Sequence, residues 1–313
     1  MQISILGSYG EGNLGDEAIL AGILTHFPND EVVIFTHNSE YTAKLYPDAI
    51  VRPMLPAGFR SYFKQAINGD LKKSLKLLKE SERILIGGGG IFYDSKFSVG
   101  RNPIKVWYWR IRLLNRVRAK FELYAVGISK LEKKVSQKLM RKICFLADKI
   151  FVRDEGSFKN LLDIGVKQEI AVIQDPAFDF PTHGEKEIYK NFTIGISLRA
   201  WEKQEEFFKK ALEKTEGLAC LHTNTLINIK LIPMSTRTDD DRKVLREFKD
   251  TLPKSLRKRT ELTEPQTPIE AYKIIAGLDF LIGMRLHSLI FAQLAGIEYL
   301  PLVYDEKVKE VLR

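Results

Sequence analysis

The fold is decided at the start of the chain by residues 1–26, which read MQISILGSYG EGNLGDEAIL AGILTH. Residues 3–6 are a short apolar run, typical of a buried β-strand. A glycine-rich loop follows, and residues 16–26 then place Ile19 and Ile23 on one face of a helix. This order of strand, loop and helix predicts the first unit of a parallel α/β sheet.

The same alternation of short apolar runs and longer helical patterns continues along the chain. We predict further strands at residues 31–35, 83–86, 121–126, 149–152, 171–173, 193–198, 229–233, 280–282 and 299–302. Helices are predicted at residues 71–80, 104–120, 134–147, 157–164, 203–215, 239–251, 268–276 and 287–295. The alternation breaks at residues 175–191, which contain two prolines and show no periodicity. The sequence therefore predicts two Rossmann-like parallel-sheet domains facing a cleft, in residues 1–180 and 181–313, with ligands bound beyond the carboxyl ends of the strands.

Composition narrows the classes of partner. The formal net charge of +9 favours anionic partners such as phosphorylated metabolites, lipid diphosphates, an anionic membrane face or nucleic acid. No zinc-finger spacing and no RNP-type aromatic motif occurs, so nucleic acid would rest on charge alone and is not predicted. The two cysteines, Cys144 and Cys220, lie in separate segments, which argues against a disulfide framework and for a reducing, cytoplasmic compartment.

Three glycines of the first loop, Gly10, Gly12 and Gly15, have the G-x-G-x-x-G spacing that lets a backbone approach an anion at a helix N-terminus. A dinucleotide site would also need an acid at the end of the second strand, to hold a ribose. That strand is followed by Thr36 and His37, so an NAD site is not favoured. The chain also has no G-x-x-x-x-G-K-[ST] phosphate loop, so the first loop is interpreted as a binding loop for another polar ligand.

The acids after this loop have two interpretations. Asp16 and Glu17 lie in the first helical turn, where the helix dipole stabilises negative charge, so helix capping alone would explain them. Alternatively, Asp16 acts as a base near a ligand hydroxyl, and Gly12, Asn13, Gly15 and Glu17 bind that ligand.

A run of four glycines, residues 87–90, follows the predicted strand at 83–86. Four glycines cost much chain entropy, so they are expected where a ligand or another backbone comes very close. A mobile turn between strand and helix is the alternative. Gly88 and Gly89 are therefore candidate ligand contacts, and Asp94 is a candidate to hold hydroxyl groups.

Two arginines stand just past predicted strands, where a guanidinium group can bind a carboxylate or a phosphate. Arg153 is the first of them, and it can equally pair with Asp154 or Glu155 beside it. Arg199 is the second, at the end of the first strand of the second domain. Trp201 follows Arg199, and simple packing would account for it.

The sharpest pattern is residues 283–288, GMRLHS, which join a predicted strand to an apolar helix. Arg285 carries a permanent positive charge, and His287 can donate or accept a proton near neutral pH. Both lie at a helix N-terminus, where an anion is stabilised. A lone histidine is more often structural, but this histidine follows an arginine in a glycine-led turn, which predicts an anion site with a proton donor. Lys307 is a candidate for the same site, and a solvated lysine is the alternative.

Taken in order, these blocks resemble the polysaccharide pyruvyl transferase family, and its bacterial cell-wall members most closely. The matching blocks are residues 12–20 (GNLGDEAIL), 87–90 (GGGG), 152–155 (VRDE), 175–176 (DP), 197–201 (SLRAW), 233–234 (PM) with Asp239, 283–287 (GMRLH), and 304–305 (YD) with 307–308 (KV). The first block and the last two are specific, and the others are weak alone. The sequence departs from its relatives after residues 126–129, where their usual glycine-proline pair is missing.

The resemblance implies a GT-B-like fold, phosphoenolpyruvate as the donor, and a ketal-linked pyruvate on a sugar as the product. No further cofactor is implied, and the arginines suffice for the electrostatics without a metal. The implied donor-site residues are Arg153, Arg199, Arg285, Leu286 and Lys307. The implied acceptor is an amino-sugar-containing glycan carried on a lipid, bound by Gly12, Asn13, Gly15, Glu17, Gly88, Gly89 and Asp94. His287 is the expected general acid, Arg285 assists it, and Asp16 is a candidate base, although the identity of the base is left open.

A nucleotide-sugar glycosyltransferase of the same fold is the alternative, but it would need a carboxylate for ribose hydroxyls, and residues 283–288 contain none. A non-catalytic sugar-binding protein is a third class. Residues 105–120 are basic, aromatic and helix-patterned, which suits an anionic membrane surface or, equally, a core helix whose arginines reach into water. We therefore expect a cytoplasmic protein, peripheral at the inner face of the plasma membrane, whose oligomeric state is not predicted.

Overall fold

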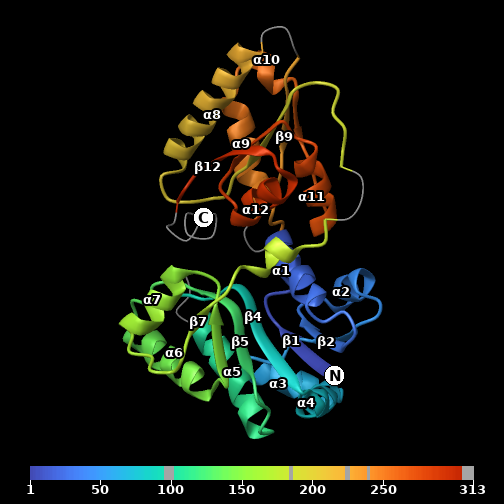
Figure 1. The fold of residues 1–313 in the computed structure, drawn as a ribbon, viewed down its shortest axis with the longest axis vertical. Coiled ribbons are helices and arrows are strands. Elements are labelled where there is room, and N and C mark those ends of the chain that lie inside the picture. Colours follow the sequence, from blue (N-terminus) through green and yellow to red (C-terminus); the bar gives the residue numbers. More distant parts are fainter. Residues whose placement is uncertain (95–101, 183–185, 223–225, 238–239, 305–313) are drawn as a thin grey trace. The chain divides into compact units, whose positions relative to one another are not determined.

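The chain folds as two compact α/β units, and the computed structural model describes residues 1–94, 102–182, 186–222, 226–237 and 240–304 (Figure 1). Unit 1 comprises residues 1–11 and 23–176, and unit 2 comprises residues 12–22 and 177–313. Helix α1 (Leu14–Thr25) therefore begins in unit 2 and ends in unit 1. The predicted domains were contiguous stretches of chain, whereas the observed units share this helix.

Unit 1 is built on a parallel sheet with the strand order β3-β2-β1-β4-β5-β6-β7. Its strands are β1 (Gln2–Leu6), β2 (Glu31–Thr36), β3 (Ile50–Pro53), β4 (Arg83–Phe92), β5 (Glu122–Ile128), β6 (Lys149–Val152) and β7 (Ala171–Val172). Its helices, besides the end of α1, are α2 (Ser39–Leu45), α3 (Phe59–Ile67), α4 (Asp70–Glu80), α5 (Pro103–Arg116), α6 (Lys134–Leu146) and α7 (Glu155–Asp163). Because parallel strands need crossover connections, helices cover the sheet and its central strands are buried.

Strand β4 is longer than predicted, because Gly87–Gly90 continue the strand instead of forming a turn. Gly87 has φ +137°, and a Cβ atom there would lie 2.4 Å from the carbonyl oxygen of Tyr124 on β5. On the other side, the hydroxyl of Tyr9 donates a hydrogen bond to the carbonyl of Gly87 at 2.5 Å. At Gly87, therefore, the glycine admits a neighbouring backbone of the same unit.

Unit 2 is built on a parallel sheet with the strand order β10-β9-β8-β11-β12. Its strands are β8 (Thr193–Ser197), β9 (Asn228–Leu231), β10 (Thr260–Leu262), β11 (Phe280–Gly283) and β12 (Glu298–Pro301). Its helices are α8 (Gln204–Leu221), α9 (Asp241–Thr251), α10 (Lys254–Arg257), α11 (Pro268–Ala276) and α12 (Leu286–Ala295), and a 3₁₀ turn, η1 (Pro176–Asp179), precedes them. The buried core of this unit lies between the sheet and helices α8 and α9, around residues such as Ile196, Leu231 and Phe248.

The prediction of two Rossmann-like parallel-sheet domains is confirmed. The predicted cleft between the two domains stays a prediction. Sequence analysis missed five short elements, namely α2, β3, α3, α10 and β10. Most of them are short and bury few side chains, and α3 buries no residue at all.

Candidate active site

The switch point of the unit 2 sheet brings two of the predicted loops together. Strands β9 and β10 are added on one side of β8, and β11 and β12 are added on the other side. The strand order therefore reverses between β8 and β11, which are neighbours. Their last residues, Ser197 and Gly283, face each other in register. Ligands of open α/β sheets bind beyond the carboxyl ends of the strands at such a point. The loops that carry Arg199 and Arg285 therefore leave the sheet at the place where this architecture binds ligands.

The turn from β11 into α12 is tight, and its sequence explains why. A Cβ atom at Gly283 would lie 2.7 Å from Leu289 and 3.0 Å from the hydroxyl of Ser288. The amide of Met284 donates to the carbonyl of Ser197 at 2.7 Å, which ties the turn to β8. The Ser288 hydroxyl donates to the carbonyl of Arg285, the N-cap residue, at 2.6 Å. Arg285 and His287 are thereby fixed at the N-terminus of α12.

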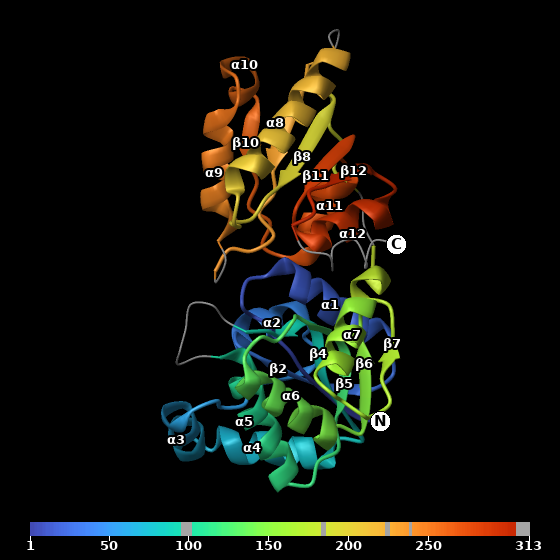
Figure 2. The same ribbon diagram turned by 90° about the vertical axis from the view of Figure 1, so that its left-hand side faces the viewer.

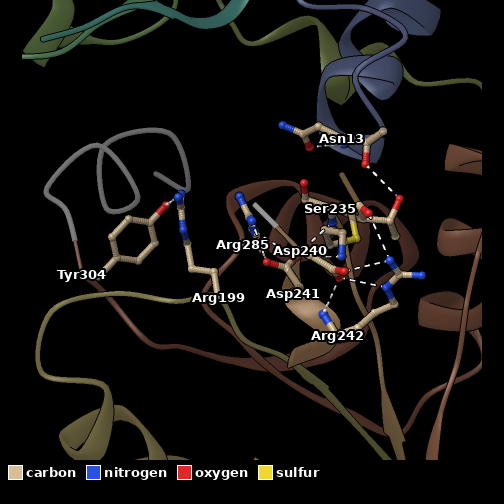
Figure 3. A network of polar contacts seen from close by, with 12 residues as sticks. Asn13, Arg199, Ser235, Asp240, Asp241, Arg242, Arg285 and Tyr304 are labelled. Atoms are coloured by element: carbon tan, nitrogen blue, oxygen red, sulfur yellow. Dashed lines mark hydrogen bonds and ion pairs between the residues drawn. The ribbon is translucent and has the colours of Figure 1, made fainter. Parts of the chain in front are cut away.

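Arg285 is buried and held by a carboxylate (Figure 3). Its Nε lies 3.0 Å from Oδ2 of Asp241, and its Nη2 lies 2.6 Å from Oδ1. Such two-pronged pairing fixes the plane of the guanidinium group. Because Nε and Nη2 both bond Asp241, the carboxylate also fixes the direction in which Nη1 points. A guanidinium group oriented in this way is suited to bind an oxyanion.

Asp241 is a site residue that sequence analysis missed. It is the first residue of α9, is 1% exposed, and accepts hydrogen bonds from the amides of Met234 at 3.1 Å and Ser235 at 3.0 Å. Burial raises the pKa of this carboxyl, and Arg285 together with the two amides opposes that rise. The signal in the sequence was the aspartate run at residues 239–241 just past a strand. The resemblance pointed to Asp239, which lies outside the described residues.

His287 lies against the first turn of α1, within unit 2. A Cβ atom on Gly15 would lie 2.1 Å from Nδ1 of His287 and 2.6 Å from its Cγ. Only a residue without a side chain fits there, so the imidazole of His287 packs directly against the backbone of Gly15. The structure shows that the ring of His287 approaches Gly15, and the predicted ligand contact at Gly15 stays a prediction.

The Gly15→Ala variant tests this contact. We expect the added methyl group to displace His287 and to lower the free energy of unfolding by about 1–3 kcal/mol, the usual cost of overpacking. Gly217→Ala is the matched control, because nothing lies within 4 Å of a Cβ atom at that position on α8. There, alanine is expected to stabilise by about 0.5–1 kcal/mol, as it does in exposed helix interiors. Denaturant unfolding measures both, and a Gly15→Ala protein as stable as the wild type would contradict the contact.

The loop before α1 is bonded to the loop after β9. The amide of Leu14 donates to the carbonyl of Met234 at 2.8 Å, and the amide of Thr236 donates to the carbonyl of Gly12 at 3.0 Å. Asn13 forms an isolated antiparallel bridge with Ser235 (Figure 3). Residues 12–17, which were predicted to belong to the N-terminal domain, thus fold with unit 2 and reach the segment that also holds Asp241.

Within this loop, the side chain of Asn13 organises the helix start. Its Oδ1 accepts the amide of Gly15 at 3.0 Å, and its Nδ2 donates to Oδ2 of Asp16 at 2.8 Å. Asp16 is half-buried, and Glu17 is fully buried. The candidate base Asp16 directly follows Gly15 in the sequence, and Gly15 is the residue against which His287 lies.

Arg199 is arranged differently from Arg285. Its guanidinium carbon lies 5.2 Å from the ring centre of Trp201 and 5.4 Å from that of Tyr304, and its Nη1 donates to the Tyr304 hydroxyl at 3.3 Å (Figure 3). The two rings are themselves 4.6 Å apart. Trp201 therefore does pack, as one interpretation held, and cation–π attraction holds Arg199 near the end of β8.

Three other predicted donor-site residues have distinct settings. Leu286 is 6% exposed, so any contact with a ligand would come from its backbone amide at the start of α12. Lys307 lies outside the described residues. Arg153 lies in unit 1, where its Nη1 is 3.2 Å from Oδ2 of Asp175 and its Nε is 3.3 Å from Oδ2 of Asp154. The predicted pairing of Arg153 with Asp154 is present, and the second partner, Asp175, was not foreseen.

The remaining acceptor candidates lie in unit 1. Gly88 and Gly89 belong to β4 and are buried, with φ +64° and +82°. The Asp94 carboxylate accepts the amides of Glu132 and Lys133, each at 2.9 Å, and it also bonds Asn102 and Ser136. Burial alone would raise the pKa of Asp94, but these hydrogen bonds lower it overall. Asp94 thus anchors the start of α6, and a role in holding sugar hydroxyls stays a prediction.

No group of three or more His, Cys, Asp or Glu side chains suited to a metal occurs among the residues that the structure describes. That the protein works without a metal stays a prediction.

Comparison with known proteins gives one family and one fold. Residues 13–306 match the family described as polysaccharide pyruvyl transferase. The chain has no significant match among curated protein sequences. UDP-GlcNAc 2-epimerase from Neisseria meningitidis, bound to UDP-GlcNAc, is 14% identical with a TM-score of 0.55, over 97% of this chain and 83% of that chain. The Anabaena protein HepE, in complex with UDP and glucose, is 14% identical with a TM-score of 0.58, over 96% of this chain and 80% of that chain. The lipopolysaccharide outer core galactosyltransferase WaaB is 14% identical with a TM-score of 0.50, over 96% of this chain and 80% of that chain. These likenesses show the GT-B fold.

Proposed function

Because the chain belongs to the polysaccharide pyruvyl transferase family, we propose that it transfers a pyruvyl group from phosphoenolpyruvate to a sugar residue of a cell-envelope polysaccharide or its lipid-linked precursor. Two hydroxyl groups of the sugar become the oxygens of a pyruvate ketal, and phosphate is released. The acceptor is an amino-sugar-containing glycan, and no cofactor is needed besides the donor.

One observation carries the proposal: Arg285 and His287 are both held on the first turn of α12, at the switch point of the unit 2 sheet. Phosphoenolpyruvate carries a phosphate and a carboxylate, so its site needs fixed positive charge. The Arg285 guanidinium supplies it, and the positive end of the α12 dipole also favours an anion at this helix N-terminus. Arg285 is already oriented by Asp241, so little reorganisation is needed when the donor binds.

The chemistry needs a proton donor at the same place. A proton from His287 adds to the methylene carbon of the donor and makes it a methyl group, which leaves a cationic centre at the neighbouring carbon. One sugar hydroxyl attacks that carbon and loses its proton. The second hydroxyl then forms the other C–O bond as the C–O bond to phosphate breaks, and its proton leaves with the phosphate. Both ketal oxygens thus come from the sugar.

A carboxylate is the natural acceptor for the proton of an attacking hydroxyl. Asp16 is our candidate, because it follows the glycine that His287 contacts and is positioned by Asn13. Asp16 and His287 lie in the same unit, so the proposal places acid and base on one folded unit. Arg199 and Lys307 are proposed as further donor contacts.

Incubation of the protein with phosphoenolpyruvate and a panel of lipid-linked and synthetic amino-sugar acceptors tests the proposal. We expect release of phosphate and an acceptor that gains the mass of pyruvate less one water. The rate is expected to be unchanged by a chelator, because the arginines supply the positive charge. No gain with any acceptor, together with thermal stabilisation by a nucleotide sugar but not by phosphoenolpyruvate, would instead support a nucleotide-sugar glycosyltransferase.

A further inference from the structure

Helix α3 (Phe59–Ile67) is amphipathic, but its apolar side faces solvent and not the core. Its large apolar side chains face solvent: Phe59 is 83% exposed, Phe63 is 59% exposed and Ile67 is 85% exposed. These residues are spaced by four, so they form one stripe along the helix. Scattered exposed apolar residues are ordinary, but a stripe that covers one side of a helix marks an interaction surface.

The inner side of α3 is polar and explains why the stripe points outward. The amide group of Gln65 donates to the carbonyl of Met54 at 2.9 Å, and the hydroxyl of Ser61 donates to the carbonyl of Gly58 at 2.9 Å. Helix α3 lies beside α4, against which it packs (Figure 2). Gln65 thus ties the helix to the segment at Met54, and Phe59, Phe63 and Ile67 have no core of unit 1 to enter.

Positive charge surrounds the stripe. Arg60 and Lys64 lie next to it on α3, and both are exposed. The neighbouring helix α4 exposes Lys72, Lys73, Lys76 and Lys79. Across α3 and α4 the acids are Asp70, which is paired with Arg52 at 2.8 Å, and Glu80, which lies 3.7 Å from Lys76 at the end of α4, so basic residues remain in excess. The surface around the stripe is therefore cationic.

Helix α5 is fixed to the same segment as α3. The side chain of Arg110 donates to the carbonyl of Leu55 at 3.0 Å, next to the Met54 carbonyl that Gln65 of α3 uses. Burial lowers the pKa of Arg110 to about 10, so this arginine belongs to the interior. The solvent side of α5 instead carries Trp109, which is 55% exposed, together with Lys105, Arg112 and Arg116.

We propose that α3, with the exposed basic residues of α4 and α5, docks onto an anionic lipid bilayer. Aromatic and aliphatic side chains beside arginine and lysine are what an interfacial helix needs, because the apolar groups enter the boundary of the acyl chains while the cations meet the headgroups. Each basic residue near such a surface strengthens binding about fivefold. Among the described helices, none is long and apolar enough to pass through a bilayer, so this contact is with the surface.

The surface would serve the proposed function by bringing the enzyme to a lipid-linked acceptor, and to that extent it rests on that function. Binding to lipid needs no turnover, so the two proposals fail separately. The basic helix of residues 105–120 was predicted both as a membrane helix and as a core helix. In the structure, Trp107 and Arg110 are buried while Trp109 is exposed, so α5 contributes only its outer side.

Sedimentation with vesicles of 70% phosphatidylcholine and 30% phosphatidylglycerol tests the surface. We expect the wild-type protein to pellet with these vesicles, more weakly at high salt and more weakly with phosphatidylcholine alone. The double variant Phe59→Ser/Ile67→Ser is expected to bind at least about tenfold more weakly, because its apolar anchors are gone. Ile188→Ser/Leu221→Ser is the matched control, since those unit 2 side chains are 88% and 78% exposed, and it is expected to bind like the wild type.

Charge reversal gives a second arm. Arg60→Glu/Lys64→Glu is expected to bind at least about tenfold more weakly, whereas Lys254→Glu/Lys258→Glu on exposed residues of unit 2 is expected to change binding much less. Pyruvyl transfer to a short water-soluble acceptor should be unchanged in all four variants. Wild-type protein that stays in the supernatant, or α3 variants that pellet as well as the wild type, would overturn the proposal. A shift from dimer to monomer in the Phe59→Ser/Ile67→Ser variant would overturn it too, since the stripe would then be a contact between copies of the chain.

Discussion

Replacing His287 by alanine is expected to lower the rate of pyruvyl transfer by about 10²–10⁴-fold, the range that a positioned general acid contributes. The donor carbon cannot become a methyl group until it receives a proton, and His287 is the titratable side chain that the β11–α12 turn holds beside Arg285. The fold should survive, because the imidazole is only half-buried and its neighbour Gly15 has no side chain that would lose a packing partner. Steady-state rates and thermal unfolding of the purified variant measure both effects.

His26→Ala is the control for this experiment. His26 is exposed, lies in unit 1 and bonds the hydroxyl of Tyr124 at 3.0 Å, so it removes an imidazole without touching unit 2. Its rate is expected to equal that of the wild type. A His287→Ala protein that keeps the full rate would remove His287 from the mechanism and leave the Arg285 anion site to be explained separately.

Replacing Arg285 by methionine is expected to reduce the free energy of unfolding by about 3–5 kcal/mol, in addition to removing donor binding. The reason lies in its partner: Asp241 is 1% exposed and would remain buried without its counter-ion. Arg242→Met is the matched control, because Arg242 pairs with Asp240 at 2.7 Å on the surface. Such an exposed pair contributes about 0–1 kcal/mol, so the control should lose little.

The destabilisation of Arg285→Met is expected to depend on pH. Burial raises the pKa of Asp241, and the variant lacks the arginine that opposes the rise. A carboxyl whose pKa is higher in the folded state favours folding while it is protonated, so its contribution is complete below about pH 4 and is lost as the pH rises through the folded value. The difference from wild type should therefore be smaller at pH 5 than at pH 8.

A second substitution separates charge from packing. Asp241→Asn in the Arg285→Met background removes the buried charge and keeps the shape, so it should recover part of the lost stability. Denaturant unfolding of the two single variants and the double variant forms a cycle that measures the coupling. Equal destabilisation at both pH values, with no recovery in the double variant, would show that the pair acts through packing alone.

The layered fold was predictable because its signals are local. Buried strands such as residues 31–36 are continuous apolar runs, and the helices between them repeat apolar residues every three to four positions. The Gly283–Ser288 turn was also visible, since a glycine before an arginine and a histidine at a strand end is a compact pattern. What these signals share is that each lies within about ten residues of chain.

The parts that were missed depend on distant contacts. Asp241 became a site residue only because Arg285, 44 positions later, turns back to it. The role of Gly15 is set by a histidine whose place in space no local pattern reveals. In helix α3 the helical spacing of Phe59, Phe63 and Ile67 is local and could have been recognised, but only the structure shows that these residues face outward.

The sharing of α1 between the units has a consequence for how the protein is made. Residues 12–22 leave the ribosome well before their partners in unit 2, such as Met234 and Ser235, which follow more than 200 positions later. At about 5–20 residues per second, this segment waits on the order of ten seconds or more for the strands it joins. Residues 23–176 can fold meanwhile with residues 1–11, whereas residues 12–22 cannot join unit 2 until its strands have been synthesised. The Gly15–His287 contact, on which the proposed chemistry rests, is therefore among the last to form on a newly made chain.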